Sequence, residues 1–272
     1  MSLVHHLRCS ELRPKWQNWF YRIVEKNYLQ SVDGFIFNSK TTQSVVQALI
    51  RDGKPDIVAH PPTDRFGTGK ISEDLIRERT KGDKLRILFL GNVIERKGLH
   101  TIIEALRRVG RDNISSYRLD VVGGMTVEPK YAEGIRQQVM IDGLSSIVTF
   151  HGALDHEPLI ELYRGSHVMV VPSSYEGYGI VYFEGMGFGL PAIGTTVGAA
   201  GEIITHGRDG YLIEPGDAEA LATHINGLAT NRERLMELSL NALSRYRLQP
   251  KWDETAGRIR EFLQKQIEEF SV

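Results

Sequence analysis

The sequence predicts an α/β protein whose main part is a Rossmann-like parallel sheet. Two observations predict it. From residue 85 onward, short apolar runs of strand length alternate with longer runs of helical periodicity, and several of the predicted strands end in glycine. Such alternation implies βαβ crossovers, which make the strands parallel and place helices on the faces of the sheet.

Composition excludes several classes of protein. The 272 residues suffice for two small domains or one large one. With 33 basic and 34 acidic residues the net charge is −1, so we expect no nucleic-acid partner. Cys9 is the single cysteine, which excludes an internal disulfide framework and a cysteine-built zinc site. Because no apolar run reaches the roughly 18 residues of a membrane span and the start has no signal-peptide core, we predict a cytoplasmic protein.

Residues 1–66 have the pattern of a partial amino-terminal α/β domain. The expected elements are a helix at 11–30, a strand at 34–39, a helix ending near Asp52 and a strand at 56–62. Ser39 or Thr41 is expected to cap the second helix. Sixty-six residues are too few for a complete doubly wound sheet. The polar residues 67–83 are interpreted as a linker with one short helix.

Residues 84–248 have the pattern of a complete Rossmann-like domain. Strands are expected at 85–91, 117–124, 147–152, 167–173, 190–196 and 210–215, and helices at 98–109, 130–142, 156–164, 180–188, 199–206 and 217–228. The remaining residues, 249–272, form a tail whose predicted helix at 251–270 has a long apolar face that needs a partner.

One stretch, residues 170–191, is the strongest candidate for a binding site. An apolar run ends at Pro172, a turn follows with Glu176 and two glycines, and a short helical segment contains Glu184. Positions just past the carboxyl end of a strand bind ligands in open α/β sheets. Glycines there let an anion approach backbone N–H groups closely.

The two carboxylates of this stretch are expected to act separately. If both lay on a helix, Glu176 and Glu184 would be roughly 12 Å apart along its axis. That exceeds the roughly 5–9.5 Å between the paired carboxylates of glycosidases. We therefore expect them to hold two ends of one long ligand.

A second candidate site is the turn GNVIERKG at residues 91–98, between a predicted strand and a predicted helix. Lys97 is a compact cation suited to phosphate, with Arg96 beside it. A solvated Arg–Lys pair at a helix start is the alternative for this turn taken alone.

Together these residues resemble the retaining family-four glycosyltransferases, also described as glycosyl transferases group 1, which have two Rossmann-like domains facing each other across a cleft. The resemblance rests on a pattern in residues 172–191, in which Tyr178 replaces the usual Phe, and on a G-R-x-x-x-x-K-G turn, in which Asn92 replaces the usual Arg. The matching positions are Pro172, Ser173, Glu176, Gly177, Gly179, Glu184, Gly189 and Pro191, with Lys97 and Gly98 of the earlier turn.

The resemblance implies transfer of a sugar from a GDP- or UDP-linked donor to a sugar, glycan or lipid-linked acceptor, with retention and without metal or cofactor. It assigns sugar contact to Glu176 and His6, diphosphate contact to Lys97, and ribose contact to Glu184. The implied catalytic residues are Glu176, Lys97 and His6, and the implied donor contacts are Gly91, Asn92, Arg96, Lys97, Gly123, Ala153, Leu154, Gly177, Tyr178, Gly179, Ile180 and Glu184.

The resemblance also implies that the sequence holds the carboxyl-terminal half of such a transferase, with a truncated amino-terminal domain and a tail helix that crosses back to it. A missing amino-terminal half or a partner subunit would then complete the cleft. Two alternatives remain: a sugar-nucleotide epimerase of the same architecture, and a nonenzymatic module that binds nucleotide sugars or a partner. For the tail, packing on the carboxyl-terminal domain is the alternative.

The predicted helix at 11–30 mixes cations with Trp16, Trp19, Phe20 and Tyr21. Basic helices with aromatic residues can lie on anionic membranes. Packing of these aromatic residues on the sheet is the preferred interpretation, so a membrane surface is an alternative partner rather than the expected one.

Overall fold

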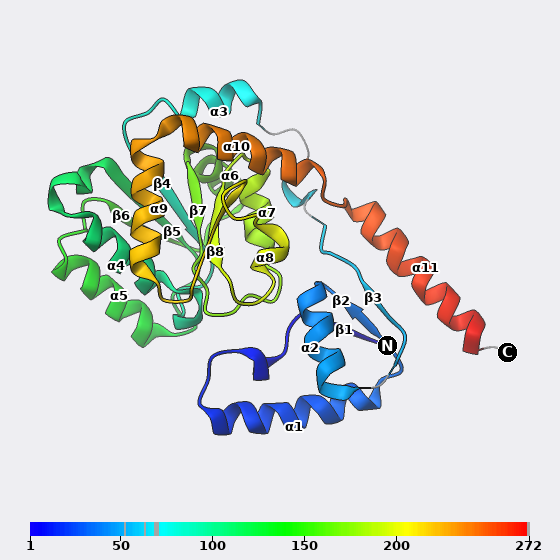
Figure 1. The fold of residues 1–272 in the computed structure, drawn as a ribbon. Helices are drawn as coiled ribbons and strands as arrows, with labels where there is room; N and C mark the ends of the chain where they lie inside the picture. The colour runs from blue at the N-terminus through cyan, green and yellow to red at the C-terminus, as the bar shows by residue number, and fades with distance from the viewer. Residues whose placement is uncertain (52, 63, 68–70, 271–272) are drawn as a thin grey trace.

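The structure is a computed structural model and describes residues 1–51, 53–62, 64–67 and 71–270. The predicted helix end near Asp52, part of the predicted linker and the last two residues of the predicted tail lie outside these ranges. Two parallel sheets organise the described residues, one of three strands and one of six. They lie side by side, with the amino-terminal sheet below the larger one in Figure 1.

The six-stranded sheet has the order β6-β5-β4-β7-β8-β9. This is the order of the Rossmann fold, in which the chain starts at the centre and winds outward in both directions. Its strands are β4 (Leu85–Leu90), β5 (Tyr117–Val122), β6 (Val148–Gly152), β7 (Val168–Val170), β8 (Ala192–Thr195) and β9 (Gly210–Ile213). The predicted alternation and parallel pairing are confirmed.

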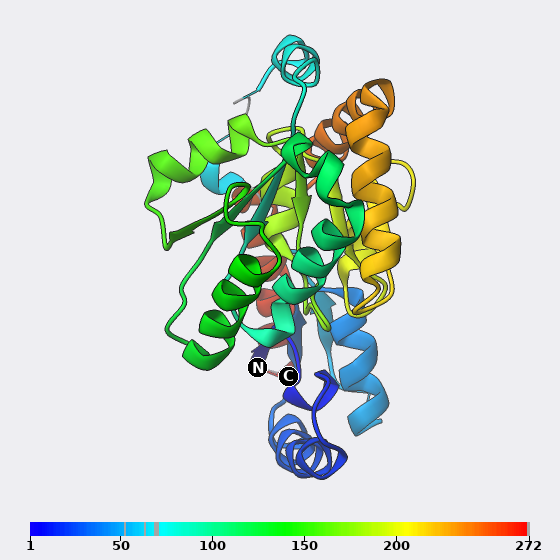
Figure 2. The same cartoon turned by 90° about the vertical axis from the view of Figure 1, so that its left-hand side faces the viewer.

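Helices cover both faces of this sheet, as two views at right angles show (Figures 1 and 2). Ile87, Leu88 and Phe89 of β4 are therefore fully buried, since consecutive residues of a strand point to opposite faces. The helices are α4 (Leu99–Val109), α5 (Pro129–Ile141), α6 (His156–Gly165), α7 (Ile180–Met186), α8 (Ala200–Ile203), α9 (Ala218–Thr230) and α10 (Arg232–Arg247).

The smaller sheet has the order β1-β2-β3 and carries two helices. The elements are β1 (Ser2–Val4), α1 (Lys15–Ser31), β2 (Phe35–Phe37), α2 (Lys40–Ile50) and β3 (Asp56–Val58). Ser39 caps α2, as predicted, because its Oγ accepts a hydrogen bond of 3.0 Å from the Thr42 amide. A small core that includes Val4, Leu29 and Phe37 holds these elements together.

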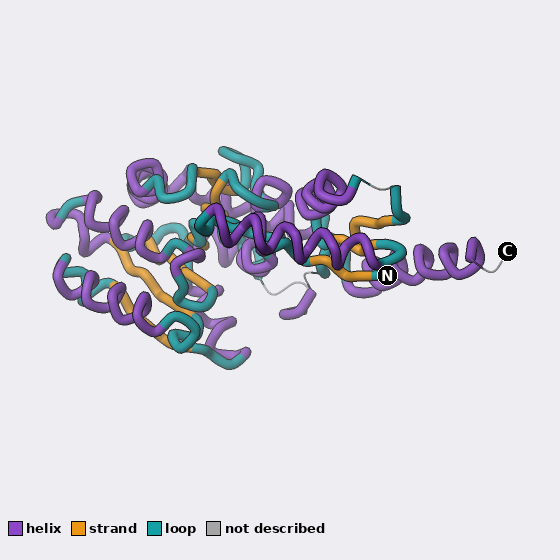
Figure 3. Tube along the Cα trace, turned by 90° about the horizontal axis from the view of Figure 1, so that it is seen from below, coloured by secondary structure: helices purple, strands orange, loops and turns teal. Residues whose placement is uncertain are grey.

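The preferred interpretation of α1 is wrong. Trp16, Trp19 and Phe20 do not pack on the sheet, since 70%, 66% and 57% of their respective surfaces are exposed. The physical reason is that three strands of three residues offer little surface, and α1 packs mainly against α2 and the short 3-10 helix η1 (Arg8–Ser10). Seen from below, α1 runs along the underside of the molecule (Figure 3).

The described parts of the linker and the tail each contain one α-helix. The linker holds α3 (Glu73–Arg79), as expected, whereas α10, at the end of the larger domain, was not predicted. The tail helix α11 (Trp252–Phe270) reaches the smaller sheet, as the resemblance implied: Thr255 donates to the His60 carbonyl at 3.0 Å and Arg258 to the Val58 carbonyl at 3.0 Å. Within the described ranges, no helix combines the length and the apolarity that crossing a bilayer requires.

Candidate functional site

The two candidate turns meet at the carboxyl ends of β4 and β7. These strands are neighbours in the sheet but distant in sequence, so they mark its topological switch point. The turns are joined directly, because the Ser174 amide donates to the Arg96 carbonyl at 2.8 Å and the Arg96 guanidinium donates to the Tyr175 carbonyl at 2.7 Å. The structure thus brings together residues that lie about 80 positions apart.

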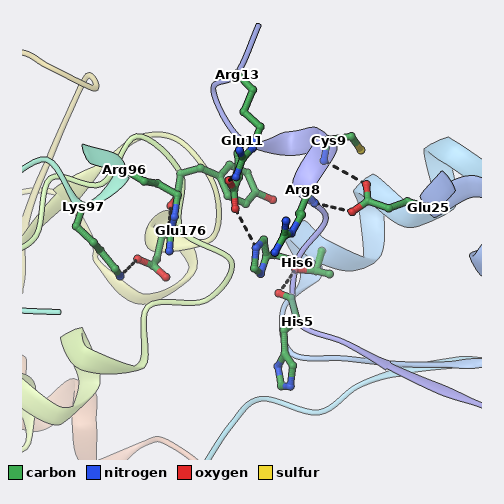
Figure 4. A network of polar contacts seen from close by, with 12 residues as sticks. His5, His6, Arg8, Cys9, Glu11, Arg13, Glu25, Arg96, Lys97 and Glu176 are labelled. Carbon is green, nitrogen blue, oxygen red and sulfur yellow. Dashed lines mark hydrogen bonds and ion pairs between the residues drawn. The ribbon is translucent and has the colours of Figure 1, made fainter. Parts of the chain in front are cut away.

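Lys97 and Glu176 form an ion pair at this point. The Lys97 Nζ lies 2.6 Å from Glu176 Oε2 (Figure 4), and the Ser173 hydroxyl donates to the same oxygen at 3.3 Å. Both side chains are only 14% and 13% exposed, so the pair is shielded from solvent. A phosphate that approached Lys97 would compete with this carboxylate for the ammonium group.

Glycines let these turns pack this closely. Gly98 has φ of 72°, and a Cβ there would lie 2.1 Å from the Pro172 carbonyl oxygen. Gly123 has φ of 145°, and a Cβ there would lie 2.0 Å from the carbonyl oxygen of Gly91. Gly123 therefore has a packing role between the turns after β4 and β5, whatever else it contacts.

Asn92, which stands in place of the usual Arg, holds the neighbouring turn. Its Oδ1 accepts from the Gly124 amide at 3.2 Å, and the Val93 amide donates to the Gly124 carbonyl at 2.9 Å. Arg96, the other cation of the turn, is occupied by the Tyr175 carbonyl. Lys97 is therefore the cation of this turn that is paired with a carboxylate across the switch point.

Glu184 lies in α7 and is almost fully buried, with 3% of its surface exposed. Tyr163 donates to its Oε2 at 2.9 Å, and the Arg65 guanidinium lies 3.3 Å from its Oε1. Burial raises the pKa of Glu184, although Tyr163 and Arg65 both favour the ionised form. Arg65 belongs to the 3-10 helix η2 (Asp64–Phe66), and its side chain is 63% exposed, so it is the accessible partner of this carboxylate.

The turn that contains Gly177, Tyr178 and Gly179 contacts the smaller sheet. A Cβ at Gly177 would lie 2.7 Å from the His5 carbonyl oxygen and 2.8 Å from the His6 Cβ. Tyr178 is 5% exposed and its ring stacks on His60 at 5.7 Å, so its side chain is occupied by packing. Ile180, the first residue of α7, is 37% exposed.

His6 faces a carboxylate that sequence reasoning did not identify. Its Nε2 lies 3.1 Å from Glu11 Oε1, and Glu11 also accepts two hydrogen bonds from Arg13 (Figure 4). Burial alone would raise the pKa of Glu11, but Arg13, Arg96 and His6 together lower it. The segment with Glu11 and Arg13, with Arg96 opposite, lines a cavity of about 380 Å³.

Glu202 joins the two sheets in a way that the sequence did not predict, because its side chain caps α2 of the smaller sheet. It accepts from the Lys40 amide at 3.0 Å, the Thr41 amide at 2.7 Å and the Thr41 hydroxyl at 2.6 Å. The hydroxyls of Ser39 and Thr42 lie 3.0 and 3.5 Å from the Gly177 carbonyl oxygen. The first turn of α2 is thereby joined to the candidate site.

The loop after β6 borders the same end of the sheet. Ala153 is exposed and Leu154 is half-buried against the main core. Gly152 accepts a hydrogen bond of 2.8 Å from the Gly123 amide, which fixes this loop beside the turn after β5. The predicted contacts at Gly123, Ala153 and Leu154 thus come from adjoining loops, and their contact with a ligand stays a prediction.

Fold and site together define an α/β protein with a Rossmann-type sheet whose switch point faces a second parallel sheet. Residues 71–245 match the family described as Glycosyl transferases group 1, and the chain belongs to that family. The family predicted from the resemblance is thus confirmed.

Curated relatives agree with this assignment. The chain is 26% identical over 209 residues to the GDP-mannose-dependent alpha-(1-6)-phosphatidylinositol monomannoside mannosyltransferase of Mycobacterium tuberculosis, covering 74% of this chain and 53% of that protein. It is 29% identical over 181 residues to the D-inositol 3-phosphate glycosyltransferase of Rhodococcus opacus, covering 64% of this chain and 40% of that protein. The chain therefore spans about half the length of these relatives or less.

Solved structures show the same fold. Anabaena Alr3699/HepE in complex with UDP and glucose superposes with a TM-score of 0.80 at 21% identity, covering 96% of this chain and 70% of that one. Sucrose-phosphate synthase from Thermosynechococcus elongatus gives 0.79 at 23% identity, covering 98% and 67%. The predicted fold, an α/β protein with parallel sheets, is confirmed.

Proposed function

We propose that the chain contributes the donor side of a retaining glycosyltransferase that uses a GDP- or UDP-linked sugar. The observation that supports this most directly is the shielded Lys97–Glu176 pair at the switch point of a Glycosyl transferases group 1 chain. One relative is named for GDP-mannose and one fold neighbour was crystallised with UDP and glucose. The test below therefore includes both bases.

Donor binding would exchange partners within the site. The diphosphate takes the Lys97 ammonium, with the N–H groups of Gly177 and Gly179 nearby, and frees Glu176 to meet the sugar hydroxyls. The ribose takes the Glu184 oxygen that Arg65 now occupies, and the base lies against Ala153 and Leu154. Gly91, Asn92, Arg96, Tyr178 and Ile180 complete the proposed donor surface through their backbone or by holding the turns.

The reaction needs stabilisation of the leaving group. The bond between the sugar C1 and the diphosphate oxygen breaks with its electrons on the diphosphate, the acceptor hydroxyl oxygen bonds to C1 on the same face, and the hydroxyl proton passes to the released diphosphate. Lys97 and the backbone N–H groups oppose the new negative charge, which is the kind of preorganised contribution that dominates many enzymes. Glu176 opposes positive charge on the ring, and His6 orients the sugar.

The proposal extends to the surroundings of the site. Protein cations take the place of a metal, and a cytoplasmic location accords with the single cysteine. A sugar, glycan or lipid-linked acceptor would approach from the smaller sheet, where the cavity beside Glu11 and Arg13 opens. Family membership favours transfer over the epimerase and the nonenzymatic module.

A thermal-shift panel with UDP, GDP, UDP-glucose and GDP-mannose tests donor binding. A ligand at a hundredfold excess over its Kd adds about 2.7 kcal/mol, which corresponds to a rise in melting temperature of roughly 5–10 °C. Lys97→Ala should abolish the shift. Lys84→Ala should not, because Lys84 is an exposed cation at the amino-terminal end of β4, away from the site. The donor-site proposal fails if no nucleotide or nucleotide sugar stabilises the chain.

The two carboxylates can then be separated. Glu184→Ala should weaken binding of the free nucleoside diphosphate, whereas Glu176→Ala should weaken mainly the sugar-bearing donor. Calorimetric titration of each variant with both ligands measures this difference. Equal losses for both ligands in both variants would refute the two-ended arrangement.

A further inference from the structure

The exposed face of α1 is mostly apolar and aromatic between Trp16 and Tyr28. Its exposed apolar residues recur at helical intervals of three and four, which puts them on one side of the helix. They are Trp16, Trp19, Phe20, Ile23, Val24 and Tyr28, each between 41% and 70% exposed. Leu12, just before the helix, is 72% exposed. Large contiguous apolar patches on a protein surface mark interaction sites.

A line of cations borders this face. Lys15, Arg22 and Lys26 are spaced by seven and four residues and therefore share one line along the helix. Trp19 lies four residues after Lys15 and three before Arg22, so this line runs beside the aromatic residues. Within the described ranges, none of the three cations has an ion pair.

The helix offers no exposed acid to offset these charges. Its single carboxylate, Glu25, accepts hydrogen bonds from the Arg8 amide at 2.7 Å and the Cys9 amide at 3.2 Å, on the side that faces η1 (Figure 4). The exposed surface of α1 is thus largely apolar, and the charged side chains exposed on it are all cations.

We propose that α1 docks the chain on an anionic lipid surface. Aromatic residues with polar edges favour the boundary between headgroups and acyl chains, and each Lys or Arg near an anionic leaflet strengthens binding. Protein interfaces are enriched in aromatic residues as well but depleted in lysine, so it is Lys15 and Lys26 that argue against a second copy of the chain as the occupant. The inference reverses the preferred sequence interpretation, because Trp16, Trp19 and Phe20 are exposed and do not pack on the sheet.

Lipid binding is measured on the full chain with vesicles of equal parts phosphatidylcholine and phosphatidylglycerol, and with phosphatidylcholine alone. We expect flotation with the anionic vesicles only, and loss of binding when ionic strength rises from about 0.1 M to about 1 M, since the screening length falls from about 10 Å to about 3 Å. No nucleotide sugar is present, so the outcome is independent of the proposed transferase activity.

Charge variants assign the binding to α1. Lys15→Ser, Arg22→Ser and Lys26→Ser together should lower vesicle affinity roughly 100-fold. The matched control, Lys84→Ser, Lys130→Ser and Lys251→Ser, removes the same charge from other exposed positions and should retain most of the affinity. Equal losses in both triple variants would overturn the assignment to α1.

Tryptophan fluorescence reports on the aromatic face directly. Trp252→Phe leaves Trp16 and Trp19 as the only tryptophans of the chain, and their emission should shift to the blue and resist acrylamide quenching with anionic vesicles. Trp16→Ser with Trp19→Ser should abolish flotation while melting at the wild-type temperature, since both positions are exposed. The proposal would be overturned if the wild-type chain did not bind vesicles. It would also be overturned if the double tryptophan variant still bound vesicles but no longer formed dimers that the wild-type chain forms.

Discussion

Glu202→Ala tests how the smaller sheet is held against the candidate site. Lys40 and Thr41 lie in the first turn of α2, where no helical carbonyl is available to their amides. The Glu202 carboxylate accepts from both amides, at 3.0 and 2.7 Å, and from the Thr41 hydroxyl. The Ser39 cap of Thr42 is separate from these bonds, so α2 itself should survive the substitution.

The expected loss of free energy in Glu202→Ala follows from the backbone amides that the substitution leaves without a partner. Loss of a capping side chain costs about 0.5–2 kcal/mol, and Glu202 caps two amides with a half-buried carboxylate, so we take about 1–2 kcal/mol. That corresponds to a factor of roughly 5–30 in an equilibrium. Because the bonds join the two sheets, the loss should appear in their association and not in the helix.

Hydrogen exchange followed by mass spectrometry on peptides covering residues 38–43 measures this loss. Exchange should be roughly 5–30 times faster in Glu202→Ala, intermediate in Glu202→Gln, and unchanged in Glu237→Ala, whose carboxylate pairs with Arg234 in the same helix. The nucleotide-induced thermal shift should also shrink, because Ser39 and Thr42 contact the Gly177 carbonyl. Wild-type exchange rates in Glu202→Ala would refute the reasoning.

Two pH-dependent predictions concern buried groups. His167 is held neutral, since its Nδ1 accepts from the Arg86 amide at 2.9 Å, and burial lowers its pKa from 6.5 to about 4. At about 1.4 kcal/mol per pKa unit, about 3 kcal/mol of unfolding free energy present above pH 6.5 should be lost as the pH falls through 4. Urea denaturation should show this loss in the wild type and not in His167→Gln. Glu184 should give the opposite pH dependence, because burial raises its pKa: the unfolding free energy that it contributes below pH 4.5 is lost as the pH rises. Glu184→Gln should therefore be more stable than wild type at neutral pH but bind nucleotide more weakly, and lower stability of the variant there would contradict the assignment.

The larger sheet could be predicted because each element is encoded locally. Strands buried on both faces are continuous apolar runs, and the helices between them have their own periodicity, so order and type could be inferred for 85–230. The same signal was present for α10, where Leu235, Leu238 and Ala242 are buried at helical spacing.

The contacts between the two sheets could not be predicted. Arg65 lies beside Glu184, which is 119 residues away in sequence. Glu202 caps α2 by contacting Thr41 and Lys40, which are 161 and 162 residues away. No periodicity specifies such contacts, since they depend on how two separately folded parts meet. The exposure of α1 was missed for a related reason. Its aromatic spacing indicates a helix with an apolar face, but the spacing does not say whether a sheet, another chain or a lipid covers that face.

Both carboxylates of the candidate site are already paired with cations, and this has a consequence for ligand binding under the proposed function. Glu176 neutralises Lys97, and Arg65 neutralises much of Glu184, so neither charge is left buried and unpaired. A nucleotide sugar would replace these partners and add few new bonds. Its binding free energy is therefore the difference between the contacts that it forms and the ion pairs that it breaks. The exchange would also give order to the reaction: Glu176 becomes available to the sugar only once a diphosphate has taken Lys97, and a free sugar would meet a carboxylate that is still engaged.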